Sequence, residues 1–278
     1  MTGSEPSGSS GPSGPAAPSH AITRIEVPVD TRAPGGTTNA YLVDGLLVDP
    51  AARTDKLDAA IEERVDAVAV THTHPDHVGA VASYAELTDA AVFAHADYVD
   101  RFVDATGAEP DATFRDGDTV GDTGVRAVDT PGHAPDHVAF AIEIDGDPLR
   151  ELLSGDLAVA EGSVVVGGPG GDLQAYLDSL EQVRDAGYDR LHPGHGPPIG
   201  DPKTTCQRLI DHRLEREQAV LAAVEGGASD LDGVLDAAYE KDLTGVEDLA
   251  RATVRAHLEK LVAEGRIRRT WVDRLADL

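Results

Sequence analysis

Short apolar runs separated by glycine, proline and aspartate make up most of the chain between residue 21 and about residue 170. Runs of this length, rich in valine, isoleucine and alanine and bounded by turn residues, are typical of β-strands. The pattern predicts strands at residues 21–29, 39–43, 45–50, 66–70, 91–94, 125–128, 138–144, 149–153 and 163–166. Segments 55–64 and 76–87 have helical spacing instead. Strands in series, then strands mixed with helices, predict a layered α/β architecture rather than a strict βαβ repeat.

The pattern changes after Asp201-Pro202, where the chain becomes helical. Helices are predicted at residues 203–224, 231–239 and 246–264, and Gly265 should end the last of them. The following RIRRTWV predicts a short strand or wing, so the end of the chain looks like a winged-helix module. We therefore expect a domain at residues 21–202 and a winged-helix-like domain at 203–278. Residues 1–20, rich in Ser, Gly and Pro, are expected to be a disordered tail.

Charge divides the chain at the same point. The formal net charge is −27, from 23 Lys and Arg against 50 Asp and Glu. Residues 1–202 hold 11 basic and 35 acidic residues, whereas residues 203–278 hold 12 and 15. So acidic a surface is tolerated when salt screens it, and it resembles that of proteins from halophilic archaea. The stretch from Arg251 onward is locally basic, in contrast to the rest.

Two absences narrow the classes of protein. No run approaches the roughly 18 apolar residues of a membrane span, and the first residues lack the basic and apolar parts of a signal peptide. We therefore expect a cytoplasmic protein without a membrane partner. Cys206 is the only cysteine, so an internal disulfide and a thiolate cage for zinc are excluded. Any metal must be held by nitrogen and oxygen.

Four metal-capable side chains lie within six residues, directly after the strand expected at 66–70. The run is His72-Thr73-His74-Pro75-Asp76-His77. Residues two apart in an extended loop project the same way, which pairs the first two histidines. Proline suits the first helical turn, which would direct the aspartate and last histidine to a second position. This division into two pairs indicates metal binding rather than helix capping.

Three more candidate ligands end or follow expected strands, in turns that contain glycine. They are His133 in TPGH, Asp156 in SGD and His195 in PGHG. Loops at strand ends are where a rigid scaffold displays functional residues. Among the other histidines, His95 is expected at the surface and His192 in a structural role. His137, four residues after His133, is expected either to contact a substrate phosphate or leaving group or to cap the next strand.

Together, the HxHxDH run, the later His, the Asp and the final His resemble the metallo-β-lactamase superfamily. The resemblance covers about residues 21–202 and implies a four-layer αβ/βα sandwich of the α/β class. It implies two metal ions. The ligands would be His72, His74 and His133 for the first metal, Asp76, His77 and His195 for the second, and Asp156 between them.

A closer similarity is to the β-lactamase-like protein 2 subgroup. The segments that carry it are NAYLV at 39–43, TPGHAPDH at 130–137, LSGD at 153–156, HPGHGPPI at 192–199 and HRLEREQ at 212–218. The subgroup implies an endoribonuclease that acts on single-stranded RNA. The glyoxalase II thioesterases share the metal motifs, which implies hydrolysis of a thioester or lactone as the alternative.

Five imidazoles and two carboxylates suit two Zn²⁺ ions, with Fe or Mn left open by ligand type. A bridging water would lose a proton and become the nucleophilic hydroxide, oriented by Asp76 as the catalytic residue. The C-terminal module would assist RNA binding, act as a nucleic-acid-binding regulator, frame the entrance to the site or mediate formation of a homodimer. A mononuclear iron enzyme that oxidises sulfur is a more distant alternative.

Overall fold

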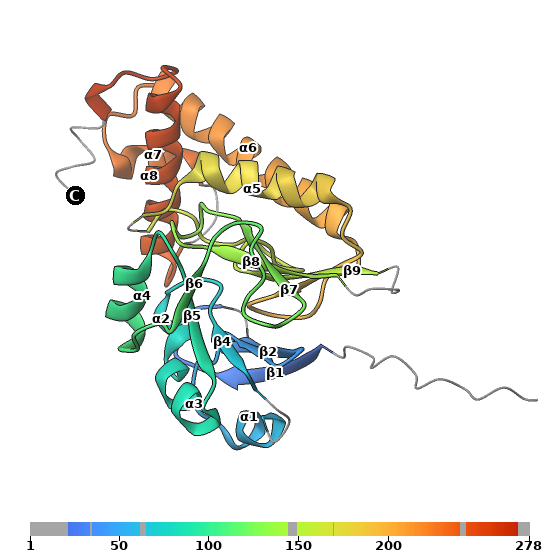
Figure 1. Cartoon of the computed structure of the whole chain (residues 1–278). Coiled ribbons are helices and arrows are strands. Elements are labelled where there is room, and N and C mark those ends of the chain that lie inside the picture. The colour runs from blue at the N-terminus through green and yellow to red at the C-terminus, as the bar shows by residue number, and fades with distance from the viewer. Residues whose placement is uncertain are drawn as a thin grey trace, which may run out of the picture.

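The computed structural model describes residues 22–33, 35–61, 65–143, 149–168, 170–239 and 243–271. The predicted tail at 1–20, Val272 and Arg274 lie outside the described residues. The described strands form two sheets (Figure 1).

The first sheet has six strands in chain order. They are β1 (Thr23–Pro28), β2 (Thr37–Val43), β3 (Leu46–Val48), β4 (Ala67–Ala69), β5 (Ala91–His95) and β6 (Ala112–Phe114). The first three pair antiparallel, and β3 to β6 pair parallel. Parallel strands end at the same edge of a sheet, so the loop after β4 leaves at the edge where β3 and β5 also end.

The second sheet has four strands in the order β10-β9-β8-β7. They are β7 (Val125–Asp129), β8 (Val138–Glu143), β9 (Arg150–Gly155) and β10 (Arg190–Pro193). Strand β8 runs antiparallel to both β7 and β9, and β10 runs parallel to β9. It follows that β7, β9 and β10 run in one direction and end at one edge.

Alternating apolar positions turn the two sheets into a sandwich. In β2, Tyr41 and Val43 face the core between the sheets, whereas Leu42 packs toward the helices outside the first sheet. In β8, Phe140 lies between the sheets, and Ala141 packs toward the helices outside the second sheet. Successive side chains of a strand point to opposite faces, so each sheet is buried on both sides.

Helices cover the outer faces and complete four layers (Figure 1). The first sheet is covered by α1 (Asp55–Ala60), α2 (Pro75–Val78), α3 (Val81–Thr88) and α4 (Val99–Thr106). The second is covered by α5 (Leu173–Ala186) and the start of α6 (Pro202–Glu225). The αβ/βα architecture predicted by the resemblance is confirmed.

Three predicted elements differ from the structure. The helix expected at 76–87 is two helices that meet at Gly79 and Ala80, where the backbone N–H of Ala80 donates to the carbonyl of Pro50 at 2.9 Å and a Cβ on Gly79 would lie 2.5 Å from the carbonyl oxygen of Ala51. Residues 163–166 form a loop rather than a strand, and residues 266–271 form turns and a helical start rather than a wing. The prediction missed β6, β10, α4 and α5.

The C-terminal helices α6, α7 (Leu231–Ala238) and α8 (Glu247–Ala263) contribute to two cores. Leu209 of α6 and Ala256 of α8 belong to the core beneath the second sheet, together with Leu180 of α5. The far end of α6 forms a separate cluster with α7, α8 and Trp271. The division at residue 202 stays a prediction, and apolar packing crosses it. No helix among the described residues is long and apolar enough to cross a membrane.

Candidate metal centre

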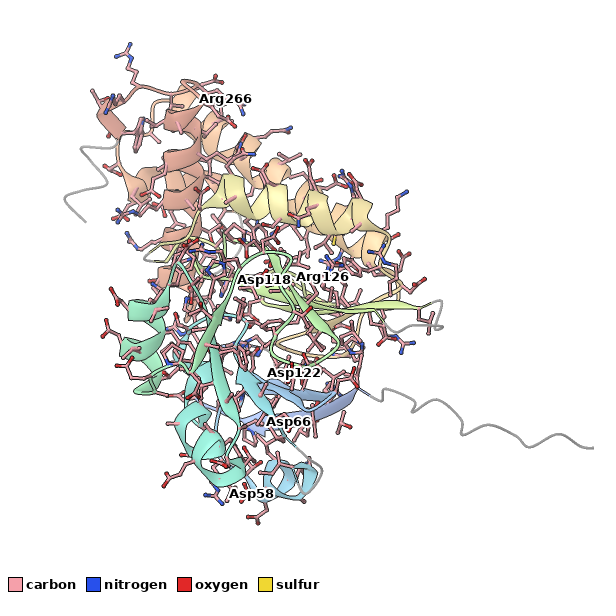
Figure 2. The ribbon with its side chains drawn as sticks, viewed as in Figure 1. Asp58, Asp66, Asp118, Asp122, Arg126 and Arg266 are labelled. Carbon is pink, nitrogen blue, oxygen red and sulfur yellow. The ribbon has the colours of Figure 1, made fainter. Side chains whose placement is uncertain are left out.

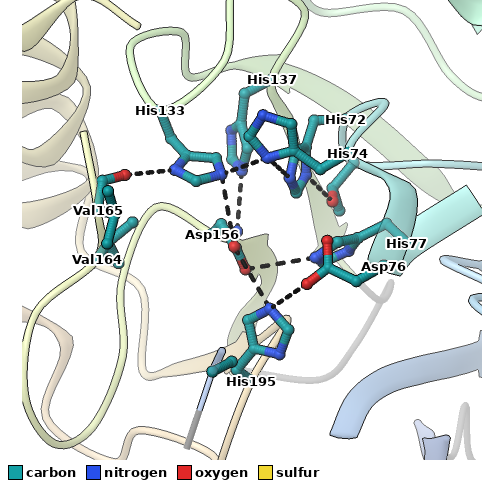
Figure 3. A network of polar contacts seen from close by, with 12 residues as sticks. His72, His74, Asp76, His77, His133, His137, Asp156, Val164, Val165 and His195 are labelled. Carbon is teal, nitrogen blue, oxygen red and sulfur yellow. Dashed lines mark hydrogen bonds and ion pairs between the residues drawn. The ribbon is translucent and has the colours of Figure 1, made fainter. Parts of the chain in front are cut away.

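The seven candidate ligands meet at the edge where β4, β7, β9 and β10 end (Figure 3). The loop after β4 and helix α2 carry His72, His74, Asp76 and His77, the loop after β7 carries His133, and the loops after β9 and β10 carry Asp156 and His195. Three groups of donor atoms lie within 4.8 Å of one another: His72 with His74 and His133, Asp76 with His77 and His195, and His72 with His77 and Asp156. The first two groups have the members of the two sets that the resemblance implies, and the third joins one histidine of each set to Asp156.

Three imidazole nitrogens converge in the first group. The Nδ1 atom of His74 lies 2.9 Å from Nε2 of His72 and 2.9 Å from Nε2 of His133. In the metal-free protein at least one close pair of these nitrogens must share a proton, because neutral imidazole offers one N–H and one lone pair.

Asp156 lies between the two sets of histidines. Its Oδ2 atom is 3.5 Å from Nε2 of His133 and 3.5 Å from Nε2 of His195. Its Oδ1 atom is 3.7 Å from Nε2 of His77. Asp76 belongs to the second group, and its Oδ2 atom is 3.6 Å from Nε2 of His195.

The outer nitrogens of three histidines bond to acceptors that fix their orientation. His133 donates from Nδ1 to the carbonyl of Val165 and His195 donates from Nδ1 to the carbonyl of Thr37, both at 2.8 Å. His77 donates from Nδ1 to Asp49 at 2.9 Å. Metal-binding histidines commonly hold their second nitrogen in this way. In their neutral form these three histidines therefore direct the lone pair of Nε2 into the centre.

Asp49 directly follows β3, in the segment LLVDP, and orients candidate ligands without being one of them. Besides His77, it accepts hydrogen bonds from the backbone N–H of Thr71 at 2.7 Å and the hydroxyl of Thr71 at 2.8 Å. The Thr71 oxygen in turn lies 3.1 Å from Nδ1 of His72. No sequence motif identifies Asp49 as a functional residue. Its only signal was an aspartate directly after a buried strand.

Strand β2 holds the loop of His195 across the sandwich. Asn39 donates its side-chain amide to the carbonyls of Pro193 and Gly196, both at 2.8 Å, and Tyr41 donates its hydroxyl to Pro193 at 2.7 Å. Gly194 leaves no room for a side chain, because a Cβ would lie 2.6 Å from Oδ1 of Asp156. The NAYLV and PGHG motifs are thus two sides of one contact.

Burial and neighbouring charges set the protonation of the metal-free centre. Burial and the adjacent His77 hold the pKa of His72 well below its usual value, and burial and His133 lower the pKa of His74 to about 4. For His77, burial acts to lower the pKa, but Asp49 and Asp156 outweigh it and raise the pKa to about 9. Against the effect of burial, His77 and the hydrogen bond to His195 hold the pKa of Asp156 below its usual value.

Two buried donor atoms support the fit of a metal. Among the residues that the structure describes, Nε2 of His77 and Oδ1 of Asp156 have no hydrogen-bond partner. Leaving such groups unsatisfied in the interior is costly, and converging lone pairs of imidazoles and carboxylates are what a divalent cation binds. The nitrogen and oxygen donors therefore fit the metal ions that the resemblance implies.

The family model of the metallo-beta-lactamase superfamily matches residues 33–195. The chain belongs to this superfamily. A curated relative is the beta-lactamase-like protein 2 homolog of Drosophila melanogaster, 33% identical over 73% of this chain and 70% of the relative. Another is the atrochrysone carboxyl ACP thioesterase of Aspergillus fumigatus, 30% identical over 68% of this chain and 60% of the relative.

Solved structures agree with this membership. The metallo-beta-lactamase family protein TTHA1429 from Thermus thermophilus covers 88% of this chain and 94% of its own, with 27% identity and a TM-score of 0.70. TTHA1623, solved in a di-iron-bound form, covers 63% of this chain and 96% of its own, with 30% identity and a TM-score of 0.50. The chain is thus a metal-binding hydrolase of the metallo-β-lactamase superfamily.

In this member of the superfamily, a cavity of about 590 Å³ opens onto the centre. Five candidate ligands border it: His74, Asp76, His133, Asp156 and His195. Its other walls are mostly apolar, formed by the loop at 159–165, Pro197 and Leu249 of α8. The C-terminal helices therefore take part in framing the entrance.

The described histidines outside the centre do not line this cavity. His137 is buried, donates from Nδ1 to the carbonyl of Thr130 at 2.9 Å and accepts at Nε2 from the backbone N–H of Asp156 at 3.0 Å. Burial, with the neighbouring His133, lowers its pKa to about 3. It is therefore placed to hold Asp156 rather than to contact a substrate. His95, expected at the surface, is buried instead, and its Nε2 atom lies 3.2 Å from Oδ1 of Asp129.

Acidic side chains such as Asp58, Asp66, Asp118 and Asp122 lie on the part of the chain before residue 202, and Arg266 lies in the bend after α8 (Figure 2). Four cations of the basic stretch there form ion pairs with carboxylates. The pairs are Arg251 with Asp232, Arg255 with Glu259, Lys260 with Glu217 and Arg266 with Glu217. A cation held by a carboxylate is less available to a phosphate, so these four side chains are weaker candidates for phosphate contacts than the sequence indicated.

Proposed function

We propose that the chain is a dinuclear hydrolase that cleaves a carbonyl substrate, most suitably a thioester with an apolar acyl group. The observation that carries this proposal is the cavity beside the metal centre. Apart from the candidate ligands its walls are mostly apolar, and the one Lys or Arg side chain that borders it within the described residues, Arg32, forms an ion pair of 2.6 Å with Asp248. A cavity of this kind suits an acyl chain better than a chain of phosphates.

The metal centre would hold two ions. His72, His74 and His133 would bind the first, Asp76, His77 and His195 the second, and Asp156 would contact both. Zinc suits these donors, and iron is a second candidate because the relative TTHA1623 was solved with two irons. Measuring metal per chain in the purified protein tests this assignment, and one ion per chain would contradict the dinuclear proposal.

When bound, the two ions would lower the pKa of a water and polarise the substrate carbonyl. The chain itself orients the groups around them. The Thr31 hydroxyl oxygen accepts a hydrogen bond from the backbone N–H of Ala33. The same hydroxyl donates its proton to Oδ2 of Asp76 at 2.6 Å. Asp76 borders the cavity and is held in place to orient the attacking water. Hydrolysis would add that water across the C–S bond and release a carboxylic acid and a thiol.

The test compares substrates and a cavity variant. We expect the loaded enzyme to hydrolyse acyl thioesters with a kcat/KM that rises with acyl length, and His74→Ala to abolish the reaction. Leu249→Trp, which narrows the cavity wall, should lower kcat/KM for long acyl chains more than for short ones. Leu214→Trp is the matched control, since Leu214 is exposed on α6 and does not border the cavity. Equal rates for all acyl lengths would contradict the proposed acyl site.

The endoribonuclease prediction is tested in the same assay. RNA binding rests on several phosphate contacts, whereas the basic residues at 251–266 are ion-paired. We therefore expect no cleavage of a labelled single-stranded oligoribonucleotide at moderate or high salt. Cleavage that His74→Ala abolishes would replace the thioester proposal. Four properties stay predictions from the sequence: a role as a nucleic-acid-binding regulator, formation of a homodimer, a cytoplasmic location and origin from a cell with a salt-rich interior.

A further inference from the structure

His133 is held in place by segments that lie far from it in the chain. Its backbone turn is fixed by α5: Ser179 donates to the carbonyl of Pro131 at 2.8 Å, and the N–H of Asp172 donates to the carbonyl of Gly132 at 2.8 Å. Gly132 has φ of 128°, and a Cβ there would lie 2.2 Å from the backbone nitrogen of Tyr176. Tyr176 is thus the surface on which this turn rests.

The ring of His133 is fixed by a second segment, the loop between β9 and α5. Val165 of that loop accepts the Nδ1 proton of His133 at 2.8 Å (Figure 3). This bond determines which ring nitrogen keeps a free lone pair, and it aims Nε2 at His74 and Asp156. The position of the Val165 carbonyl therefore decides whether His133 can act as a ligand.

One side chain from the C-terminal helices contacts both supports. Arg213 of α6 donates from Nη2 to the carbonyl of Val164, next to Val165, and its guanidinium lies 5.7 Å from the ring centre of Tyr176. Tyr176 in turn donates its hydroxyl to the carbonyl of Leu157, the residue after Asp156, at 2.9 Å. Arg213 thus connects to the segments of two candidate ligands.

Arg213 is unusual for its position, because it is only 3% exposed. Burying a cation costs free energy unless well-placed partners and hydrogen bonds compensate for its lost hydration. Arginine combines a planar fork of donors with stacking on aromatic rings, and both features serve here. A methionine of similar length would fill the space without the charge, so packing alone does not account for the arginine.

We infer that Arg213 is a positioning residue for His133, and through it for the first metal. This inference rests on the proposed dinuclear centre. It assigns to the C-terminal helices a role in building the site, in addition to bordering its entrance. The same arginine gives the Val164–Val165 loop one fixed position relative to the turn at His133.

The experiment compares Arg213→Met and Arg213→Lys with Arg216→Met in the full chain. Arg216 is a matched control, because it also lies on α6, donates to a backbone carbonyl (Ala238) and stacks on a tyrosine (Tyr239, 3.8 Å), but its contacts are with the α7 end of the molecule. Chelator competition measures the affinity of each of two metal equivalents. Imidazole ¹⁵N shifts of the metal-free protein measure the tautomer of His133, and circular dichroism reports folding.

We expect Arg213→Met to weaken one metal equivalent about tenfold to one-hundredfold, the usual cost of losing support behind a ligand, and to leave the other unchanged. The His133 shifts should move from the Nδ1–H tautomer toward a mixture. Arg213→Lys should show a smaller change of the same kind, and Arg216→Met neither change. If Arg213→Met does not fold, the lysine variant carries the comparison.

Two results would overturn the inference. One is wild-type affinity for both equivalents and an unchanged His133 tautomer in the folded Arg213 variants. The other is an equal loss at both equivalents in the Arg213 and Arg216 variants, which would assign both arginines to general stability. A wild-type protein that binds no metal would refute the dinuclear centre instead, and the tautomer measurement would still test the role of Arg213.

Discussion

Asp49 shows how one side chain determines the chemistry of two others. It accepts from His77 and twice from Thr71, whose hydroxyl lies against His72, so it supports one candidate ligand of each metal. Its φ of 51° is in the left-handed region, which is uncommon for a residue other than glycine. A backbone held in such a conformation at a site is a mark of functional constraint.

We expect Asp49→Asn to weaken the second metal about tenfold to one-hundredfold. An asparagine amide can donate to Nδ1 of His77 and move the ring proton to Nε2, the atom that should bind metal. Chelator competition measures the loss. Asp44→Asn is the control, because Asp44 also has a positive φ, of 49°, and lies in the turn between β2 and β3. Equal affinity in Asp49→Asn and wild type would show that the carboxylate is not needed.

Gly194 is expected to be irreplaceable for steric reasons. A Cβ at this position would lie 2.6 Å from Oδ1 of Asp156 and 2.8 Å from Cε1 of His77. Gly194→Ala should therefore displace these groups and abolish binding of at least one metal, while circular dichroism stays that of the wild type. Gly200→Ala, where a Cβ would meet nothing within 4 Å, should bind metal normally. Full metal content in Gly194→Ala would contradict the observed crowding.

The sequence predicted the donor atoms far better than their supports. The candidate ligands were recognisable because histidine and aspartate at strand ends have few other uses in such number. Asp49 and Arg213 were missed because their partners lie 22 to 28 and 49 residues away in the chain. Their role depends on how the two sheets and α6 pack. The periodicity of a single segment does not contain that information.

At the scale of elements, apolar periodicity predicted most strands and the long C-terminal helices. It failed where a tertiary contact outweighs the pattern. The spacing of apolar residues at 76–87 is continuous, yet the helix breaks where Gly79 meets the carbonyl of Ala51. Residues 163–166 have a strand-like composition. In the structure, however, Arg208 and Arg213 of α6 donate hydrogen bonds to the carbonyls of Gly162 and Val164 in this loop, where a strand would pair with a neighbouring strand.

Helix α8 contains a buried histidine that should make stability sensitive to acid. His257 is fully buried, and neither ring nitrogen has a hydrogen-bond partner among the described residues. Burial, together with Arg213, Arg216 and Lys260, lowers its pKa to about 3 from the usual 6.5. Below pH 6.5 the unfolded chain takes up a proton here that the folded chain does not, until the pH approaches 3. The free energy of unfolding therefore falls as pH falls through this window.

His257→Leu should remove both effects. Replacing two unsatisfied nitrogens with an apolar side chain should raise the free energy of unfolding by about 1 kcal/mol at pH 7. The advantage over wild type should widen below pH 6.5, by at most about 1.4 kcal/mol per pH unit. Urea unfolding at pH 7, 6 and 5 measures it. A difference between the two proteins that does not change with pH would show that His257 is solvated or paired.

At the scale of the whole molecule, the distribution of charge is the main feature not explained by the fold. Residues 1–202 carry most of the acidic excess, and exposed carboxylates such as Asp118 and Asp122 lie in the segment before β7 (Figure 2). Like charges on one surface repel, and this repulsion opposes the compact state. The fold is shared with relatives, so the acidity is a property of this chain's surface and not of the fold.

We expect the midpoint of thermal unfolding to rise steadily as NaCl increases from 0.1 M to 1 M, because the Debye length falls from about 10 Å to about 3 Å. Repulsion between exposed carboxylates is then screened, whereas the buried contacts around the metal centre are little affected. The variant Asp118→Asn with Asp122→Asn should show a shallower dependence, since it removes part of the repulsion. Thermal melts followed by circular dichroism measure both slopes. A midpoint that is independent of salt in the wild type would mean that the acidic surface costs the fold little, and would remove the reason for expecting a salt-rich cell.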